Sequence, residues 1–458
     1  MRAQLGHFPE SAFDIDPKTG FMPSSIPVGR LPATWEPWES LLDRAIREKM
    51  RPGDITGLPE RDAARSARWR ERVRQVCNPL PYYFSRFLTW IIRQTPVLPT
   101  ELLIDSPALL RRAHLVLAFL LHFYVQTLPP TVPVLIPRPI SIPILKVCEQ
   151  IGMPPVITYA DTVLYNWNLL TPIDPSEFPP STDNLRCQTL FTGLPDEEGF
   201  YLSSARIELR GVEALGIMRM TLDEILVGDT VAVGRITKLL TRLTAVIDDL
   251  RKLLLDVRAC CDPDIYYNDV RPWFRGEDSA THKRKWVFEG LGTDPELEGI
   301  KPPTELSGAS AGQSSLIHTL DCFLGVDNVK STPDGKTSFM SRMQVYMPRN
   351  HRLFLDHLAK TSQPSIRAFV QNSQDEKLLE AYNGAVMALK GFRDSHMILV
   401  TLYIIGPARR ARQSEENESG QGRQEERLKG TGGTDMVKFL KTTRNRTAET
   451  VLVPEVTN

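Results

Sequence analysis

His396 is the residue whose type and position most directly suggest chemistry. Its helical neighbours on the same side are apolar or aromatic: Tyr382, Val386, Leu389, Phe392, Leu399 and Tyr403. A histidine in such a stripe is most often a hydrogen-bonded core residue. The alternative is a neutral imidazole that projects from a rigid helix into an apolar cavity, which is how haem iron is held on one side.

Two arginines could bind carboxylates near such a site. Arg393 lies one turn before His396, where its guanidinium could pair with a haem propionate or remain on the surface. Arg271 closes the run YYNDVR, so it could hold a carboxylate beside rings that stack on a planar substrate. Because Pro272 follows Arg271, a surface arginine is the other interpretation of this position.

Two runs of small residues give the backbone unusual freedom. The run KGTGGTD (429–435) could wrap N–H donors around a small charged group, or it could be a flexible loop with Asp435 as the N-cap of a following helix. It lacks the spacing of a phosphate loop. The run SGASAGQSS (307–315) permits close approach to a flat ligand or to a neighbouring helix.

Composition excludes several classes of protein. Lys and Arg total 55 and Asp and Glu total 55, so no global positive field attracts nucleic acid. The six cysteines form no C-x-x-C pair and the first residues lack the apolar segment of a signal peptide, which favours a cytoplasmic location. The usual hydrolase motifs and zinc spacings are missing from the sequence.

Helical periodicity dominates the chain. Apolar residues recur at helical spacing within 38–93 and 233–257, and a further helix is expected over 376–405, where Gly406 and Pro407 are expected to end it. The most apolar stretch, 115–128, is shorter than the roughly 20 residues that span a bilayer. We therefore expect a buried core helix there and no membrane span.

These patterns predict a mostly α fold in two domains. A smaller, mainly helical N-terminal domain (1–183) ends in a Pro-rich stretch, and a large all-helical domain (184–458) follows. The prolines of 129–143 predict an extended or looped segment. Residues 409–429 contain almost no apolar side chains and are expected to form a mobile loop.

Seven segments, taken together, resemble the indoleamine 2,3-dioxygenase family, and the fungal members in particular. They follow one another in the family's order from about Val134 to the C-terminus. The segments are LIPRPISIP with PPVITYADTVLYNW, GFYLSS, YYNDVRP, SGASAGQSS, YMPRNHRLFL, DSHMILVTLYII and KGTGGTDMVKFLKTTRNRT.

The resemblance implies a haem b enzyme with ferrous iron that adds both atoms of O₂ across the indole C2–C3 bond of L-tryptophan. The product would be N-formylkynurenine, the first intermediate of the kynurenine pathway. The large domain would hold the haem, and the smaller domain would wall the substrate side. L-tryptophan, O₂ and an electron donor are the expected partners, and the chain is expected to be a monomer.

The resemblance also implies residue roles. His396 matches the proximal iron ligand, and Arg393 matches an arginine near a haem propionate. The small-residue segment against the haem is Gly308, Ala309, Ser310 and Ala311. The substrate would be bound by Tyr159, Thr162, Phe200, Tyr266, Tyr267, Arg271, Ala311, Thr431 and Gly432. Catalytic roles fall to Ser204 near the iron-bound ligand, Arg271 at the tryptophan carboxylate, and Thr431 over the amino-acid end.

Two positions depart from the family pattern and keep an alternative open. Tyr266 stands where the family usually has Phe, and an unpartnered hydroxyl there would cost about 1–3 kcal/mol. Asp394 could pair with Arg393 and weaken the propionate contact, or be exposed to solvent. The alternative is a haem- and oxygen-binding member of the family with weak or no turnover. The presence of Arg271 and Thr431 favours the enzyme.

Overall fold

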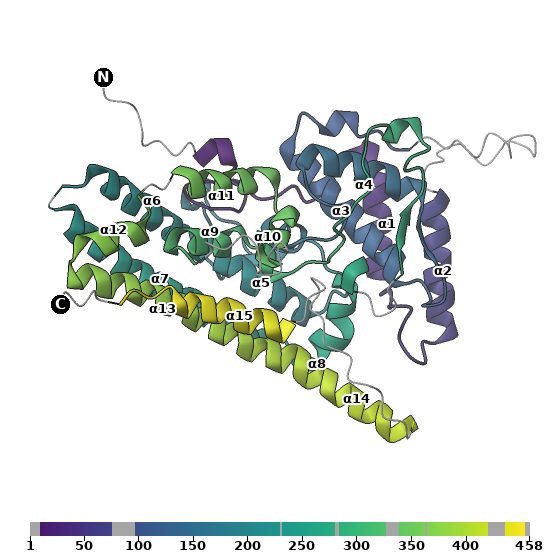
Figure 1. Ribbon diagram of the computed structural model, residues 1–458. Helices are drawn as coiled ribbons and strands as arrows, with labels where there is room; N and C mark the ends of the chain where they lie inside the picture. The colour runs from purple at the N-terminus through teal and green to yellow at the C-terminus, as the bar shows by residue number, and fades with distance from the viewer. Residues whose placement is uncertain are drawn as a thin grey trace, which may run out of the picture.

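The computed structural model describes residues 10–75, 97–229, 231–279, 284–326, 339–361, 364–419 and 436–453. Helices dominate these residues, as Figure 1 shows, which confirms the mostly α fold. The helices are α1 (Glu36–Arg47), α2 (Glu60–Gln75), α3 (Pro107–Gln126), α4 (Arg138–Ile151), α5 (Pro195–Arg210), α6 (Val212–Val227), α7 (Ala232–Cys260), α8 (Pro263–Ile265), α9 (Ser315–Leu324), α10 (Phe339–Met343), α11 (Arg349–Thr361), α12 (Ile366–Ser373), α13 (Glu376–Val400), α14 (Gly406–Ser419) and α15 (Met436–Glu449).

Four short strands accompany the helices in the described residues. Strand β1 (Val134–Ile136) pairs in parallel with β4 (Trp286–Phe288), and β2 (Trp167–Leu169) pairs antiparallel with β3 (Leu185–Cys187). Each strand has three residues. This length is too short for an alternating pattern to be recognised in the sequence.

Helix α3 forms the centre of the first of two hydrophobic clusters. Every residue from Arg112 to Val125 is buried, and α3 packs against α4 and α1. By length and composition alone α3 could cross a membrane, but 83% of its most apolar window is buried inside the protein. The expected core helix is therefore confirmed.

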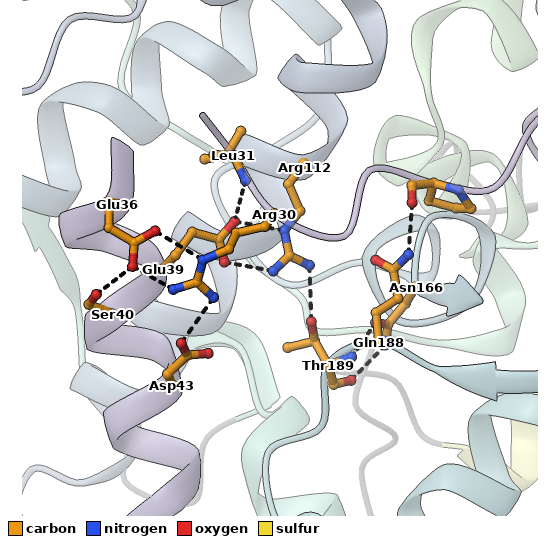
Figure 2. Close-up of polar contacts among 11 residues, drawn as sticks. Arg30, Leu31, Glu36, Glu39, Ser40, Asp43, Arg112, Asn166, Gln188 and Thr189 are labelled. Atoms are coloured by element: carbon orange, nitrogen blue, oxygen red, sulfur yellow. Dashed lines mark hydrogen bonds and ion pairs between the residues drawn. The ribbon is translucent and has the colours of Figure 1, made fainter. Parts of the chain in front are cut away.

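A buried ion pair ties α3 to α1 and to the chain before it (Figure 2). Arg112 Nη2 donates to Glu39 Oε2 at 2.7 Å, and the backbone N–H of Leu31 donates to Glu39 Oε1 at 2.8 Å. Arg112 Nη1 also donates to Thr189 Oγ1 at 3.1 Å, and the Thr189 N–H donates to Asn166 Oδ1 at 2.8 Å. Because both charged side chains are buried, removal of either would leave an uncompensated charge. The network thus fixes the N-terminal arm and the segment that leads to α5.

The second hydrophobic cluster is built around α7. This helix packs against α13, α6 and α5, and it confirms the periodicity expected for 233–257. Its fully buried side chains include Ile236, Leu240, Leu243, Ile247 and Leu250.

Both clusters draw residues from each side of residue 183. The first joins α1–α4 to residues within 257–306, and the second joins residues within 159–185 to α5, α7 and α13. In Figure 1, α1–α4 group at one end of the molecule and α6 and α12 at the other. The predicted boundary between two domains stays a prediction.

The prediction that prolines keep 129–143 out of a helix was wrong for the last part of that run. Helix α4 begins at Arg138 and contains both Pro139 and Pro143. Pro139 lies in the first turn, where its missing N–H has no helical partner in any case, and Pro143 forfeits one backbone bond. Burial of the apolar side chains around Pro143 outweighs this loss. Gly152, with φ of 67°, ends the helix in the left-handed conformation that glycine adopts readily.

The predicted helix end at Gly406 and Pro407 was also wrong. Helix α13 runs into a π-helical turn, η13 (Thr401–Ile405), and α14 follows directly. Pro407 is the second residue of α14, a position where its missing N–H costs little. Residues 409–419 are therefore helical, because arginine, glutamine and glutamate are good helix formers even without an apolar face. The remainder of the predicted loop, 420–429, lies outside the described residues.

Candidate active site

A cavity of about 250 Å³ lies where α5, α13, α15 and the segment before α9 meet. Most of its lining side chains are apolar or aromatic. Ten of the residues singled out from the sequence line it: Tyr159, Thr162, Phe200, Ser204, Tyr266, Ala309, Ser310, Ala311, Arg393 and His396. Residues more than 200 positions apart in the sequence are thus brought to one place.

Five other residues singled out from the sequence either do not line the cavity or lie outside the described residues. Gly308, Tyr267 and Arg271 are described but are not among the lining residues. Arg271 is buried, and its guanidinium carbon lies 5.5 Å from the centre of the Tyr267 ring. Burial lowers the pKa of Arg271. Thr431 and Gly432 lie outside the described residues, so the roles of all five stay predictions.

Phe392, Arg393, His396 and Leu399 form one side of the cavity, which we call the α13 wall. Burial, together with the nearby charge of Arg393, lowers the pKa of His396 to about 4, so the imidazole is neutral at physiological pH. Among the described residues, His396 has no hydrogen-bond partner. It is therefore not the hydrogen-bonded core histidine that was the more common expectation.

His396 is also isolated as a metal ligand. The described part of the chain contains no group of three His, Cys, Asp or Glu residues that could hold a metal ion. A metal bound through one imidazole must bring most of its other ligands with it, as a porphyrin does for iron. The α13 wall therefore fits a preassembled metal complex better than a bare ion.

Arg393 is held on two sides by buried partners. Its guanidinium pairs with the Asp321 carboxylate from α9 and donates to the Thr447 hydroxyl from α15. Of the two interpretations of Arg393, the surface residue was wrong, since the side chain is buried. Asp394 points elsewhere and accepts from Lys390 Nζ at 2.7 Å, because adjacent residues on a helix do not face each other.

Tyr159, Ser204 and Ser314 form another part of the lining, which we call the hydroxyl wall. Tyr159 precedes a π-helical turn, η5 (Ala160–Leu164), which carries Thr162 into the cavity. The backbone N–H of Tyr159 donates to Gln313 Oε1 at 2.8 Å, and Gln313 Nε2 donates to the Gly308 carbonyl at 2.9 Å. Gln313 thereby joins η5 to the small-residue segment.

A buried carboxylate, Asp161, shapes the turn itself. Its Oδ2 accepts from the Thr158 N–H at 2.9 Å and from Thr158 Oγ1 at 2.7 Å, while its Oδ1 lies 2.6 Å from His114 Nδ1. His114 Nε2 lies 3.1 Å from the Pro154 carbonyl. Burial opposes a charged imidazole, but the facing Asp161 carboxylate raises the pKa of His114 well above its ordinary value. Electrostatic attraction therefore anchors η5 to α3.

Glu208 stands behind the hydroxyl wall and was missed in the sequence. Tyr159 Oη donates to Glu208 Oε1 at 2.9 Å, and Ser314 Oγ donates to the same oxygen at 2.7 Å. Burial raises the pKa of Glu208 to about 7, although the Ser314 and Tyr159 hydroxyls oppose the shift. The spacing of four residues between Ser204 and Glu208 on α5 is the signal that could have found it.

Aromatic side chains complete the cavity. The rings of Phe200 and Tyr266 lie 4.5 Å apart, and Tyr266 makes an edge contact with Tyr403 at 5.8 Å. Tyr266 is buried, and no described residue hydrogen-bonds its hydroxyl. Phe339 of α10 and Phe439 of α15 also line the cavity, with ring centres 4.2 Å apart, and neither was singled out from the sequence.

Together the fold and the site define a class: a helical protein that encloses an apolar cavity, with one neutral imidazole and a set of hydroxyl groups facing inward. Comparison with known proteins gives the family. The indoleamine 2,3-dioxygenase family model matches residues 9–450, and the chain belongs to this family. Its members are haem-dependent oxidoreductases that act on tryptophan-type substrates with O₂.

Relatives from animals and fungi agree with this assignment. The chain is 33% identical to indoleamine 2,3-dioxygenase 2 of Homo sapiens over 75% of this chain and 80% of the relative. It is 30% identical to indoleamine 2,3-dioxygenase of Saccharomyces cerevisiae over 95% and 92% of the two chains. A 6-hydroxytryptophan 2,3-dioxygenase of Fusarium equiseti is 28% identical over 96% and 97%.

Proposed function

We propose that this chain is a haem-dependent dioxygenase that inserts both atoms of O₂ across the indole C2–C3 bond of L-tryptophan and forms N-formylkynurenine. The observation that carries the proposal is the neutral imidazole of His396, which faces an apolar cavity without another protein ligand nearby in the described residues. Family membership supports the same type of reaction.

The residues present fit a haem. His396 would ligate the iron through a ring nitrogen, and the small side chains of Ala309, Ser310 and Ala311 leave room for a flat ring system. When bound, the haem supplies ferrous iron for the reaction with O₂. Arg393 contributes by fixing α13 against α9 and α15 through Asp321 and Thr447, and its proposed contact with a propionate remains a prediction.

The chain's own groups bind and orient the substrate. Phe200 and Tyr266 would pack against the indole, and the apolar lining would exclude water from the reacting carbons. Ser204 would offer a hydrogen bond at the reacting face. Arg271 and Thr431 would hold the carboxylate and the amino-acid end, in accordance with their predicted roles.

The proposed reaction also requires two substrates and a reductant. L-tryptophan and O₂ are the substrates, and an electron donor keeps the haem iron ferrous. We propose a cytoplasmic monomer.

A hydroxylated tryptophan is a second candidate substrate. One relative bears the name 6-hydroxytryptophan 2,3-dioxygenase, and the hydroxyl wall offers three polar groups that a ring hydroxyl could meet. A site that hydrogen-bonds a substrate hydroxyl discriminates strongly against the analogue that lacks it. The alternative of a haem- and oxygen-binding protein with weak or no turnover is retained because Tyr266 stands at a position where the family usually has Phe.

Competition between the two amino acids tests these candidates. Haem-loaded, reduced protein is given equal concentrations of L-tryptophan and 6-hydroxy-L-tryptophan in air, and both ring-opened products are quantified by chromatography. A preference for L-tryptophan supports the proposal, and a preference for the hydroxylated substrate supports the second candidate. If neither amino acid is consumed by protein that still binds oxygen, the non-catalytic alternative is correct.

A further inference from the structure

Glu208 carries an inference beyond the proposed reaction, because its carboxyl group is buried behind the cavity and only partly satisfied. The side chain is 2% exposed. Oε1 accepts both hydroxyl hydrogen bonds, from Tyr159 and from Ser314, whereas Oε2 has no partner among the described residues. A buried carboxylate with one bare oxygen is unfavourable, and a proton on that oxygen removes the difficulty.

The two donors to Glu208 are parts of the cavity lining. Tyr159 lies at the start of η5, and Ser314 caps α9 by accepting from the Ile317 N–H at 3.4 Å. Through them Glu208 on α5 joins three elements that meet at the cavity. The direction in which each hydroxyl points therefore depends on the Glu208 carboxyl.

The described surroundings of Glu208 contain no competing charge. Tyr159, directly before η5, is the titratable group that faces it, Ser314 faces it from directly before α9, and Ser204 lies one turn away on α5. Among the described residues, no charged group contributes to the environment that sets its protonation. Its proton therefore responds mainly to burial and to these two hydrogen bonds.

We propose that Glu208 positions the hydroxyl wall, and that its neutral form is the form that favours binding of an aromatic amino acid in the cavity. This inference rests on the proposed function for the identity of the ligand. A bound ligand displaces water from the cavity and makes a charged carboxylate behind the wall less favourable. By linkage, the proton that neutralises Glu208 must then strengthen ligand binding.

The test measures binding rather than turnover. Haem-loaded full-length protein is titrated with L-tryptophan from pH 6 to pH 8, and the dissociation constant is followed by calorimetry. The wild-type affinity is expected to fall by roughly tenfold over this range, the change that one pKa unit of coupling produces. E208Q keeps an acceptor for both hydroxyls but cannot ionise, so its affinity is expected to stay constant with pH. The same decline in E208Q would overturn the proposal.

A matched control and a spectroscopic signature accompany the titration. Glu213 on α6 pairs with Arg210 and Arg242 at the surface, and E213Q is expected to keep the wild-type pH dependence. Infrared difference spectra should contain the C=O band of a protonated carboxylic acid in the wild type at pH 6, lost by pH 8 and missing from E208Q. Spectra of the two proteins that do not differ in this band would contradict the inference.

S314A provides a second route if E208Q does not fold. The Ser314 hydroxyl lowers the pKa of Glu208, so its removal should move the midpoint of the binding profile to higher pH. An unchanged midpoint would show that the contact does not control the carboxyl. Binding with this pH dependence but without product would overturn the proposed function and leave the role of Glu208 intact. Product formation with pH-independent binding would overturn the role of Glu208 alone.

Discussion

The α13 wall and the hydroxyl wall handle buried polar groups in opposite ways. In the α13 wall the charge of Arg393 is neutralised by Asp321 and the guanidinium is held further by Thr447, while the neutral ring of His396 faces the cavity without a hydrogen-bond partner among the described residues. Behind the hydroxyl wall, Glu208 has one oxygen that accepts two hydrogen bonds and one that has no partner among the described residues. The first arrangement suits a rigid holder for a prosthetic group, and the second suits a surface whose polarity changes with a ligand or a proton.

Replacement of His396 should have the largest effect, on haem binding and on turnover. Without that effect, the α13 wall would not be a holder for a prosthetic group. H396A is expected to lose uptake of haemin, measured as the Soret absorbance after reconstitution, and to lose turnover with it. Because His396 has no hydrogen-bond partner in the described residues, the apo fold should persist. H357A, on α11, is the control and should bind haem normally. Normal haem binding by H396A would remove the assigned role of the α13 wall.

The Arg393–Asp321 pair should dominate the stability of the α13 wall. D321A leaves the Arg393 guanidinium buried without its carboxylate, which costs about 3–5 kcal/mol of unfolding free energy. D394A breaks a half-exposed pair with Lys390 on the same helix and should cost less than about 1 kcal/mol. Urea unfolding of the apo proteins measures both. Equal losses in the two variants would show that the buried pair does not fix α13.

Glu208, behind the hydroxyl wall, should make the unfolding free energy depend on pH. Burial raises the pKa of Glu208 to about 7, above its ordinary value near 4.5. Because the pKa is raised on folding, the folded state holds the Glu208 proton more tightly than the unfolded state does. The contribution of this proton to the unfolding free energy is complete below pH 4.5 and is lost as the pH rises through 7. Relative to E208Q, the wild type should lose on the order of 3 kcal/mol of unfolding free energy over that window. Parallel profiles for the two proteins would contradict the raised pKa.

A single hydroxyl in the same wall should matter less. S204A is expected to lower kcat/KM by roughly fivefold to tenfold, the effect of one hydrogen bond of about 1 kcal/mol. S203A is the matched control, because the Ser203 hydroxyl already donates to the Gly199 carbonyl at 2.8 Å. Full turnover by S204A would remove Ser204 from the catalytic residues.

Tyr266 gives the smallest expected effect, with the opposite sign. Y266F removes the hydroxyl of a buried side chain, which no described residue hydrogen-bonds, and the protein should gain about 1 kcal/mol in unfolding free energy. Y403F removes a hydroxyl that donates to the Cys261 carbonyl at 2.7 Å, and it should lose a similar amount. Thermal unfolding of both variants measures these two changes in stability. A loss of stability in Y266F would mean that its hydroxyl has a partner, such as an ordered water.

The sequence predicted those features that depend on local pattern. Helix α3 was recognisable because 115–128 is the most apolar stretch of the chain, and α7 was recognisable because its apolar side chains repeat at the helical period. Pro143 and Pro407 misled the prediction, since the energy of the surrounding burial and the position within the first turn decide whether a proline is tolerated. The spacing of apolar residues indicates neither the burial around a proline nor the turn of the helix in which it lies.

The site was predicted where residue type and spacing were distinctive, as for His396 and the SGASAGQSS run. It was missed where the partners lie far apart in sequence. Glu208 and Ser314 are 106 residues apart, and Arg393 and Asp321 are 72 residues apart, so these two contacts leave no local signal, and only the four-residue spacing from Ser204 pointed to Glu208. Burial makes the partners of Glu208 and Arg393 important, because a buried polar or charged group is costly unless it is hydrogen-bonded or paired.

Isotope labelling of the product tests directly whether this chain is a tryptophan dioxygenase. Haem-loaded, reduced protein is given L-tryptophan under ¹⁸O₂, and the products are analysed by mass spectrometry. We expect a product heavier than tryptophan by two labelled oxygen atoms. Unchanged tryptophan, in the presence of protein whose iron still binds oxygen, would contradict the assignment of this chain as a tryptophan dioxygenase.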